Sequence, residues 1–430
     1  MTQIPDDFGF QADHGTLRQM ARRLLAERAP LSRTRELCER GGDDEGHAFD
    51  SGLYQDMVGL CWVGLDIDAA RGGMGMGALT LSLLLEQMGR VLLPSPFLAC
   101  SLAARALATV TEPRTAIDDD DEEEDESGEG DDSEPSTLDR IIGGDCIATV
   151  ALSEPGRGAA GLALDYAHVQ TSAAVDGDDT LVLRGEKNHV MWGTEADLVL
   201  VPARLRDEQR LGWIAVPLPC EGVEVSPEIG IDPTRRTARL RFDGARLPAT
   251  ALVADADDAE RISRELLARG LTMVAAEVCG ALEGVLELTA TYAKERLQFG
   301  KPIGAFQAVK HPIVDVMVDV ELARSLAYAA AAAIDAGVDD DEQLQLARMA
   351  KVKACEAYHH AAGRGVQLHG GFGFTYDCDV HFHVKRALFA RATLGDATLH
   401  RRALAAALFD GDTRRAALAV VERGGLTLSM

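Results

Sequence analysis

The hydrophobic pattern of this chain changes its period twice, and this change constrains the fold more than any other feature. From about residue 17 to residue 110, apolar residues recur at helical spacing between glycine-rich turns. From about residue 141 to residue 253, short runs of β-forming residues alternate with Gly, Asp and Pro. After residue 254 the helical spacing returns in longer segments. The pattern therefore predicts an α+β multidomain protein with an N-terminal α-helical domain, a middle antiparallel β-barrel and a C-terminal four-helix bundle.

The length of 430 residues also favours several domains over one hydrophobic core. We place the boundaries at residues 1–140, 141–253 and 254–430. Within the first domain, residues 118–135 read DDDDEEEDESGEGDDSEP and carry no apolar residue. Thirteen acidic residues in this run supply half of the formal net charge of −26. Such a segment repels itself and has nothing to bury, so we expect a disordered surface insertion.

Composition excludes several classes of function. The acidic balance argues against nucleic acid as a partner, because binding phosphates requires clustered Lys and Arg. The eight cysteines form no C-x-x-C pair, which is typical of reduced thiols. No signal peptide and no membrane span is visible, so we expect a cytoplasmic protein. Neither His359-His360 nor His381-x-His383 is accompanied by further ligands, so no metal site is predicted.

One glycine motif supports a competing hypothesis. Residues 156–161 read GRGAAG, the G-x-G-x-x-G pattern of an NAD-dependent Rossmann dehydrogenase. In that fold the glycines open a helix that faces a pyrophosphate. Here the following residues have the texture of short strands. A loop between strands accounts for the motif better.

Two strings in the C-terminal region carry the strongest chemical signal. Residues 292–307 read YAKERLQFGKPIGAFQ, and residues 367–375 read QLHGGFGFT. The first places an Arg, a Phe and a Gln around a helix break, a set suited to phosphate oxygens and a flat ring system. The second is a glycine-dense turn that a ligand can approach closely. From chemistry alone, both strings could equally be turns that connect bundle helices.

These strings resemble the R-x-x-F-G-x-x-I-x-x-F-Q and Q-x-x-G-G-x-G-x-T signatures of the acyl-CoA dehydrogenase family, in particular its actinobacterial-type members. The resemblance extends over nearly the whole chain except the acidic insertion. The supporting segments are LSEPG at 152–156, LRGEK at 183–187, ADL at 196–198, GGMGMG at 72–77 and MGRVLLPSPF at 88–97.

The resemblance implies FAD as the cofactor and assigns residues to it. Arg296, Phe299 and Gln307 match positions that hold the adenine dinucleotide end of FAD, commonly across a subunit contact. Gln367, Gly370 and Gly371 match the loop that meets its adenosine diphosphate. Leu152, Ser153, Val190 and Met191 match positions beside the flavin ring. Met191 stands where the family usually has Thr, which removes a side-chain hydrogen bond.

The family reaction removes a proton from Cα of an acyl thioester while a hydride leaves Cβ for flavin N5, and it requires a carboxylate base. The two family positions for this glutamate fall on Leu394 and Gly270, and neither residue is acidic. Asp396 lies two residues beyond the first position, and Glu277 lies seven residues beyond the second on the same helix face. Three readings stay open: Asp396 is the base, Glu277 is the base, or this chain contains none.

The resemblance therefore implies FAD-dependent α,β-dehydrogenation of an acyl-CoA thioester to the 2-enoyl-CoA. Electrons would pass to an electron-transferring flavoprotein. The assembly would be a homo- or hetero-tetramer built as a dimer of dimers. The alternative is a noncatalytic FAD-binding subunit of a heterotetrameric acyl-CoA dehydrogenase. An acyl-CoA oxidase, which reoxidises flavin with oxygen, is a further alternative.

Overall fold

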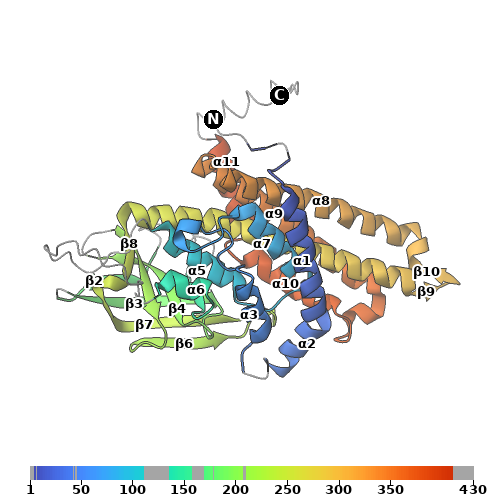
Figure 1. The fold of residues 1–430 in the computed structure, drawn as a ribbon. Helices are drawn as coiled ribbons and strands as arrows, with labels where there is room; N and C mark the ends of the chain where they lie inside the picture. The colour runs from blue at the N-terminus through green and yellow to red at the C-terminus, as the bar shows by residue number, and fades with distance from the viewer. Residues whose placement is uncertain are drawn as a thin grey trace.

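The computed structural model describes residues 4–5, 7–41, 43, 46–110, 135–156, 169–177, 179–206 and 210–409. The acidic run at 118–134 and residues 157–161 of the GRGAAG motif lie outside the described residues. Helices come first, then a sheet, then a helical bundle, which confirms the predicted order (Figure 1).

One N-terminal helix, α4, is buried between α1 and the long helices of the C-terminal region. The elements are α1 (Ala12–Arg28), α2 (Leu31–Arg40), α3 (Ser51–Gly59), η1 (Ala69–Arg71), α4 (Gly77–Arg90), α5 (Phe97–Thr109) and α6 (Thr137–Ile142). In α4 every residue from Ala78 to Gly89 is buried, as expected of a mostly apolar helix packed on all sides. Asp335 of the C-terminal region accepts hydrogen bonds from the N–H groups of Ala78 and Leu79 at 2.6 and 2.9 Å, and thereby caps α4.

The middle region is one eight-stranded sheet in the order β6-β7-β3-β2-β4-β5-β8, with β1 paired to β4. Its elements are β1 (Ala148–Val150), β2 (Ser172–Val175), β3 (Thr180–Met191), β4 (Leu198–Leu205), β5 (Arg210–Pro217), β6 (Val223–Glu228), β7 (Thr237–Pro248), η3 (Ala249–Ala251) and β8 (Leu252–Asp255). The strand pairs are antiparallel except that β1 and β2 run parallel to β4.

The predicted β-barrel is wrong in one respect, because the described sheet is open and ends at β6 and β8. Strand β6 has no fully buried residue and carries Glu224 and Glu228, which suits an edge strand exposed to water. At the other end, β8 leads directly into the next helix.

The C-terminal region is a bundle built on three long helices. Its elements are α7 (Ala256–Glu295), β9 (Leu297–Gln298), β10 (Lys301–Pro302), η4 (Ile303–Ala305), α8 (Gln307–Asp335), α9 (Asp340–His369), η5 (Gly370–Phe374), α10 (Val380–Ala392) and α11 (Ala397–Phe409). The sequence pattern did not indicate α10, whose residues VHFHVKRALFARA mix charged and apolar side chains. Within the described part of the chain, no helix combines the length and apolar character needed to cross a bilayer.

Helices α4 and α7 cross in direct backbone contact. A side chain at Gly89 would overlap the carbonyl of Glu277, and one at Gly280 would overlap the carbonyl of Glu86. A side chain at Gly284 would come within 2.5 Å of the carbonyl oxygen of Arg90. The small residues of α7 therefore serve close helix packing between the N-terminal domain and the bundle.

Candidate functional site

The arginine-bearing string forms a small exposed hairpin at the end of α7. Arg296 ends the helix, and its carbonyl accepts a hydrogen bond from Ile303 N–H at 2.8 Å, which closes the hairpin. Phe299 has a positive φ of 54° and is 89% exposed. Gln307 is the first residue of α8 and is also exposed. All three residues that the sequence assigned to the nucleotide end thus lie on the surface, around one turn.

The double-glycine string forms a second exposed turn, at the end of α9. Gln367 is exposed, and its carbonyl accepts the N–H of Gly370. Gly370 has a φ of 63°, and neither Gly370 nor Gly371 has an atom within 4 Å of where a Cβ would stand. A ligand can therefore reach this backbone directly.

The two turns lie side by side. Tyr292, in the last turn of α7, stacks on His369, the last residue of α9, with ring centroids 4.3 Å apart. The structure therefore brings all six predicted nucleotide-end residues to one end of the bundle. In Figure 1, β9 and β10 mark this end, and the large sheet lies at the opposite end of α7.

The four residues predicted to lie beside the flavin ring are in the β region. Ser153 forms an isolated bridge with Asn188, so the Leu152–Ser153 loop lies next to β3. Val190 is buried within the core of the sheet, whereas Met191 is half-buried against the large core shared with the helices. The Met191 carbonyl accepts the hydroxyl of Thr149 at 2.7 Å. Met191 offers no hydroxyl where the family usually has Thr.

The two sets of predicted cofactor residues lie on different elements of the chain. Met191 pairs with Thr237 of β7, and Arg235, two residues before Thr237, contacts Glu277 of α7. Arg296 follows Glu277 by 19 residues, which corresponds to about 28 Å along an α-helix. The flavin-side residues therefore lie near the middle of α7, and the hairpin lies at its C-terminal end.

The two positions where the family has its glutamate meet in space. A Cβ at Gly270 would lie 2.7 Å from Cδ1 of Leu394, and Leu102 of α5 is the next neighbour at 3.6 Å. Leu394 is buried. Counting residues from the two motifs identified both positions, the fold brings them together, and the Leu394 side chain lies against Gly270.

The turn that carries Leu394 is held by two buried basic side chains. Leu394 has a φ of 54°, which is unfavourable for a residue with a branched side chain. Its carbonyl accepts from His400 Nε2 at 2.8 Å. Lys351 Nζ donates to the carbonyl of Arg391 at 3.0 Å and to that of Gly395. Burial lowers the pKa of His400 to about 4, so the ring is neutral at pH 7.

Glu277, one of the two predicted bases, lies in a buried ion cluster. Its Oε1 pairs with Arg235, and also with Arg386 at 3.3 Å. Arg386 in turn pairs with Asp232 at 2.7 Å. The arginines also donate to the carbonyls of Ser95 and Leu92, so the cluster joins all three regions. Burial lowers the pKa of Arg235, and the neighbouring Arg386 lowers it further.

Asp396, the other predicted base, is exposed at the start of α11. Its Oδ1 accepts the N–H of Leu399 at 2.8 Å, the geometry of a helix N-cap. This contact accounts for an aspartate at this position without a catalytic role.

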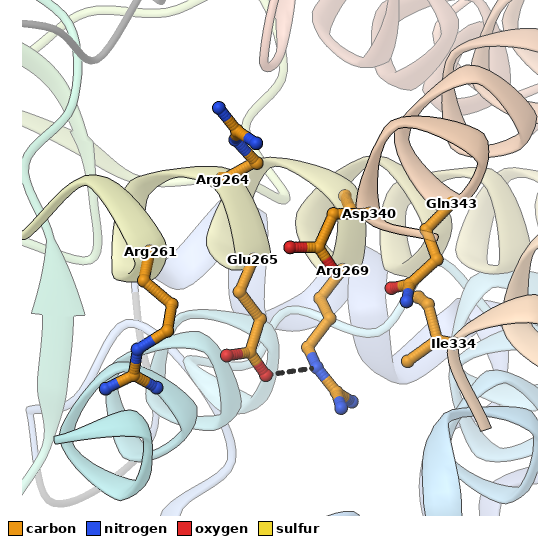
Figure 2. Close-up of a pocket in the computed structure, with 8 residues that line it drawn as sticks. Arg261, Arg264, Glu265, Arg269, Ile334, Asp340 and Gln343 are labelled. Atoms are coloured by element: carbon orange, nitrogen blue, oxygen red, sulfur yellow. Dashed lines mark hydrogen bonds and ion pairs between the residues drawn. The ribbon is translucent and has the colours of Figure 1, made fainter. Parts of the chain in front are cut away.

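A pocket of about 210 Å³ lies on α7 beside Gly270 (Figure 2). Arg261, Arg264 and Arg269 line it from α7, and Asp340 and Gln343 line it from α9. Figure 2 shows the Glu265 carboxylate directed at the Arg269 guanidinium, and the two are 2.9 Å apart.

Ion pairs across helices surround this stretch of α7. Glu265 also pairs with Arg105 of α5 at 2.6 Å, and Arg269 pairs with the buried Asp66 at 2.9 Å. These four side chains tie α5 and the η1 region to α7 directly before Gly270.

Sequence reasoning missed the side chains that fix these features. Lys351 and His400 hold the Leu394 turn, Tyr292 and His369 join the two surface turns, and Arg235 and Arg386 neutralise Glu277. His369 is part of the QLHGG string, so a signal existed for it. The others come from segments far apart in sequence and have no local signature.

Comparison with known proteins extends the resemblance. The N-terminal domain model of acyl-CoA dehydrogenase matches residues 11–113, and the C-terminal domain model matches residues 261–409, together more than half of the chain. Acyl-CoA dehydrogenase IpdE2 of Mycobacterium tuberculosis is 29% identical over 374 residues, covering 86% of this chain and 89% of that protein.

Two solved structures have a similar fold. A chain of the ChsE4-ChsE5 complex from Mycobacterium tuberculosis is 26% identical with a TM-score of 0.77, covering 94% of this chain and 99% of that one. A chain in the structure of the electron transferring flavoprotein of Acidaminococcus fermentans is 25% identical with a TM-score of 0.78, covering 94% and 100%.

Proposed function

We propose that this chain, which belongs to the acyl-CoA dehydrogenase family, is a subunit for acyl-CoA dehydrogenation that leaves the proton-abstracting carboxylate to a partner subunit. The family consists of FAD-binding oxidoreductases that act on CH–CH bonds. The reaction is the α,β-dehydrogenation of an acyl-CoA thioester. Of the alternatives that the sequence left open, we therefore favour a subunit without its own base over one in which Asp396 or Glu277 is the base.

The observation that carries the proposal is the contact of Leu394 with Gly270. An α-proton is removed only by a base within hydrogen-bond reach of it. Both positions where the family has glutamate meet here, and Leu394 fills the space between them. The nearest predicted substitutes have other contacts, since Glu277 is bonded to two arginines and Asp396 caps a helix.

The nucleotide end fits FAD well. Arg296 is exposed, where its guanidinium can form paired hydrogen bonds with phosphate oxygens. Phe299 exposes a ring suited to stacking, and the open backbone at Gly370 and Gly371 allows close approach. The flavin end fits less well, because Met191 cannot donate a hydrogen bond through its side chain.

The role of this chain's residues is to bind and orient. FAD, when bound, supplies the acceptor for the hydride that leaves Cβ. Arg296 would neutralise phosphate charge, and the backbone N–H groups at Gly370 and Gly371 would direct the nucleotide across the subunit contact. Leu394 keeps water and polar groups out of the space beside Gly270. The Cα proton would then go to a carboxylate of the partner subunit.

Two features support an assembly of more than one chain. The flavin-side residues lie in the sheet region and the nucleotide-side residues at the C-terminal end of α7, and the family resemblance places the latter across a subunit contact. The similar ChsE4-ChsE5 structure is itself a complex of two different chains. We therefore propose a heterotetramer as a dimer of dimers. The likeness to a chain from an electron transferring flavoprotein structure supports such a flavoprotein as the electron acceptor.

Anaerobic reduction of flavin tests the proposal. The full chain, purified alone and supplied with FAD, is mixed with short-, long- and branched-chain acyl-CoA thioesters, and the flavin absorbance is followed. We expect no bleaching above the rate without substrate. Bleaching by the lone chain that disappears in Asp396→Asn or Glu277→Gln would place the base in this chain and reject the proposal.

A further inference from the structure

The two surface turns that form the nucleotide end belong to different helices, and their spacing depends on how α7 and α9 pack. The helices approach closely at Gly365 of α9. A Cβ there would lie 2.8 Å from Val380 Cγ2 and 3.2 Å from both Thr289 Oγ1 and Val285 Cγ2. Beyond this contact α9 continues for about one more turn and α7 for nearly two before their exposed turns begin.

A stack of rings fills the space after this close approach. Tyr292 of α7 lies on His369 of α9 with a centroid distance of 4.3 Å and an interplanar angle of 27°. The same tyrosine is stacked with Phe372 of the glycine turn at 6.1 Å and 19°. Stacked aromatic rings attract one another beyond the burial of their apolar surface, so the stack holds the two helix ends together.

Hydrogen bonds fix the register of this stack. The Tyr292 hydroxyl donates to the carbonyl of His369 at 3.3 Å. That carbonyl belongs to the last residue of α9, so it has no partner within the helix. His369 Nδ1 donates to the carbonyl of Gly365 at 2.7 Å, and burial lowers the pKa of the ring.

The tyrosine thus acts at the peptide where the glycine turn begins. Gly370 follows with a φ of 63° and a ψ of −141°, a conformation that essentially only glycine adopts. At the other side, Tyr292 lies four residues before Arg296, and its own carbonyl accepts the Arg296 N–H at 2.8 Å. Tyr292 therefore contacts the backbone at the start of both turns, the glycine turn through its hydroxyl and the hairpin through its own carbonyl.

We infer that Tyr292 is a positioning residue that sets the spacing between the arginine hairpin and the double-glycine turn, so that both turns can bind the same dinucleotide. This inference rests on the proposed function, which assigns both turns to FAD. Tyr292 itself does not touch the nucleotide. It acts through the helix ends that carry Arg296 and Gly370.

Three variants test this role, with the protein in the oligomeric state in which it purifies and FAD as the probe. Tyr292→Leu removes the stack and the hydroxyl, and we expect the dissociation constant for FAD to rise about tenfold. Tyr292→Phe keeps the stack, and we expect it to restore affinity to within about threefold of the wild type. Arg296→Ala reports on the nucleotide site itself. Affinity is measured well below the unfolding midpoint of each variant, so that a change in stability alone does not move it.

The outcomes separate the inference from the function it rests on. If Tyr292→Leu binds FAD as tightly as the wild type while Arg296→Ala loses affinity, the positioning role is rejected and the FAD site stands. If Arg296→Ala also binds normally, the nucleotide site itself is wrong. If Tyr292→Leu does not fold, His369→Gln removes the stack from the other side. Unchanged affinity in that variant rejects the inference.

Discussion

The two ends of α7 differ in what they retain from the family pattern. At its C-terminal end, Arg296, Phe299 and the backbone of the glycine turn at Gly370 and Gly371 are exposed. Around Gly270, nearer its N-terminal end, the position of the base is filled by Leu394 and bordered by ion pairs. Under the proposed function, the exposed C-terminal end is available to a nucleotide shared with another chain, whereas Leu394 occupies the interior space beside Gly270.

The largest effect is expected for Glu277. Glu277→Gln leaves Arg235 and Arg386 with less negative charge in a buried cluster, so we expect a loss of about 3–5 kcal/mol in the free energy of unfolding. Urea denaturation measures this loss. Glu356→Gln, which breaks an exposed pair with Arg401, is the matched control and should cost less than about 1 kcal/mol. A stable Glu277→Gln variant that has lost turnover would instead identify Glu277 as a base.

Acidification should lower the free energy of unfolding through His400, which holds the Leu394 turn beside Gly270. Burial, and then the charge of Lys351, lower the His400 pKa from 6.5 to about 4 in the folded chain. The unfolded chain therefore binds more protons between these values, and stability falls as the pH drops from 6.5 towards 4. The loss is on the order of 3 kcal/mol.

His400→Asn sharpens that test, because an amide can still donate to the Leu394 carbonyl but does not titrate. The difference between wild-type and variant unfolding free energies should shrink as the pH falls from 7 to 4. An unchanged difference would mean that His400 is not a buried neutral donor in the Leu394 turn.

At the exposed C-terminal end of α7, Arg296→Ala should weaken FAD binding by about 10- to 100-fold. This is the change expected when a charge-assisted pair of hydrogen bonds to phosphate is lost. Fluorescence titration with FAD measures the change. Lys310→Ala, an exposed cation three residues into α8, should leave affinity within about twofold. Equal effects of both substitutions would indicate only a general electrostatic attraction.

The smallest effect separates the two readings of Asp396. As an N-cap it should tolerate Asp396→Asn, since asparagine caps equally well, whereas Asp396→Ala should cost about 1 kcal/mol in stability. Thermal or urea unfolding distinguishes the two. If Asp396 is the base, Asp396→Asn and Asp396→Ala should both abolish turnover.

The hairpin at Arg296 and the double-glycine turn could be located from the sequence, whereas the contacts around Gly270 could not, for a physical reason. The residues of the hairpin are contiguous in sequence, and so are those of the glycine turn, so each appears as a recognisable sequence motif. The order of helical, β and helical regions followed from hydrophobic periodicity alone. The open sheet edge at β6 depends on which strands find partners, which no local pattern specifies.

The region around Gly270 depends on contacts between distant segments. Glu277 pairs with Arg235 and Arg386, which are 42 and 109 residues away in sequence. A glutamate seven residues after Gly270 was a reasonable candidate base, because nothing in the sequence indicates that these arginines neutralise it. Likewise, counting residues placed Leu394 and Gly270 at the base positions, but only the fold brings the two together.

The most direct test of the account is the structure of the assembled protein with FAD bound. We expect Arg296 of this chain to contact the phosphates of an FAD whose flavin ring lies on a different subunit, and a carboxylate of that subunit to face the substrate. Finding Asp396 or Glu277 of this chain in front of the flavin, or Arg296 remote from any nucleotide, would contradict it.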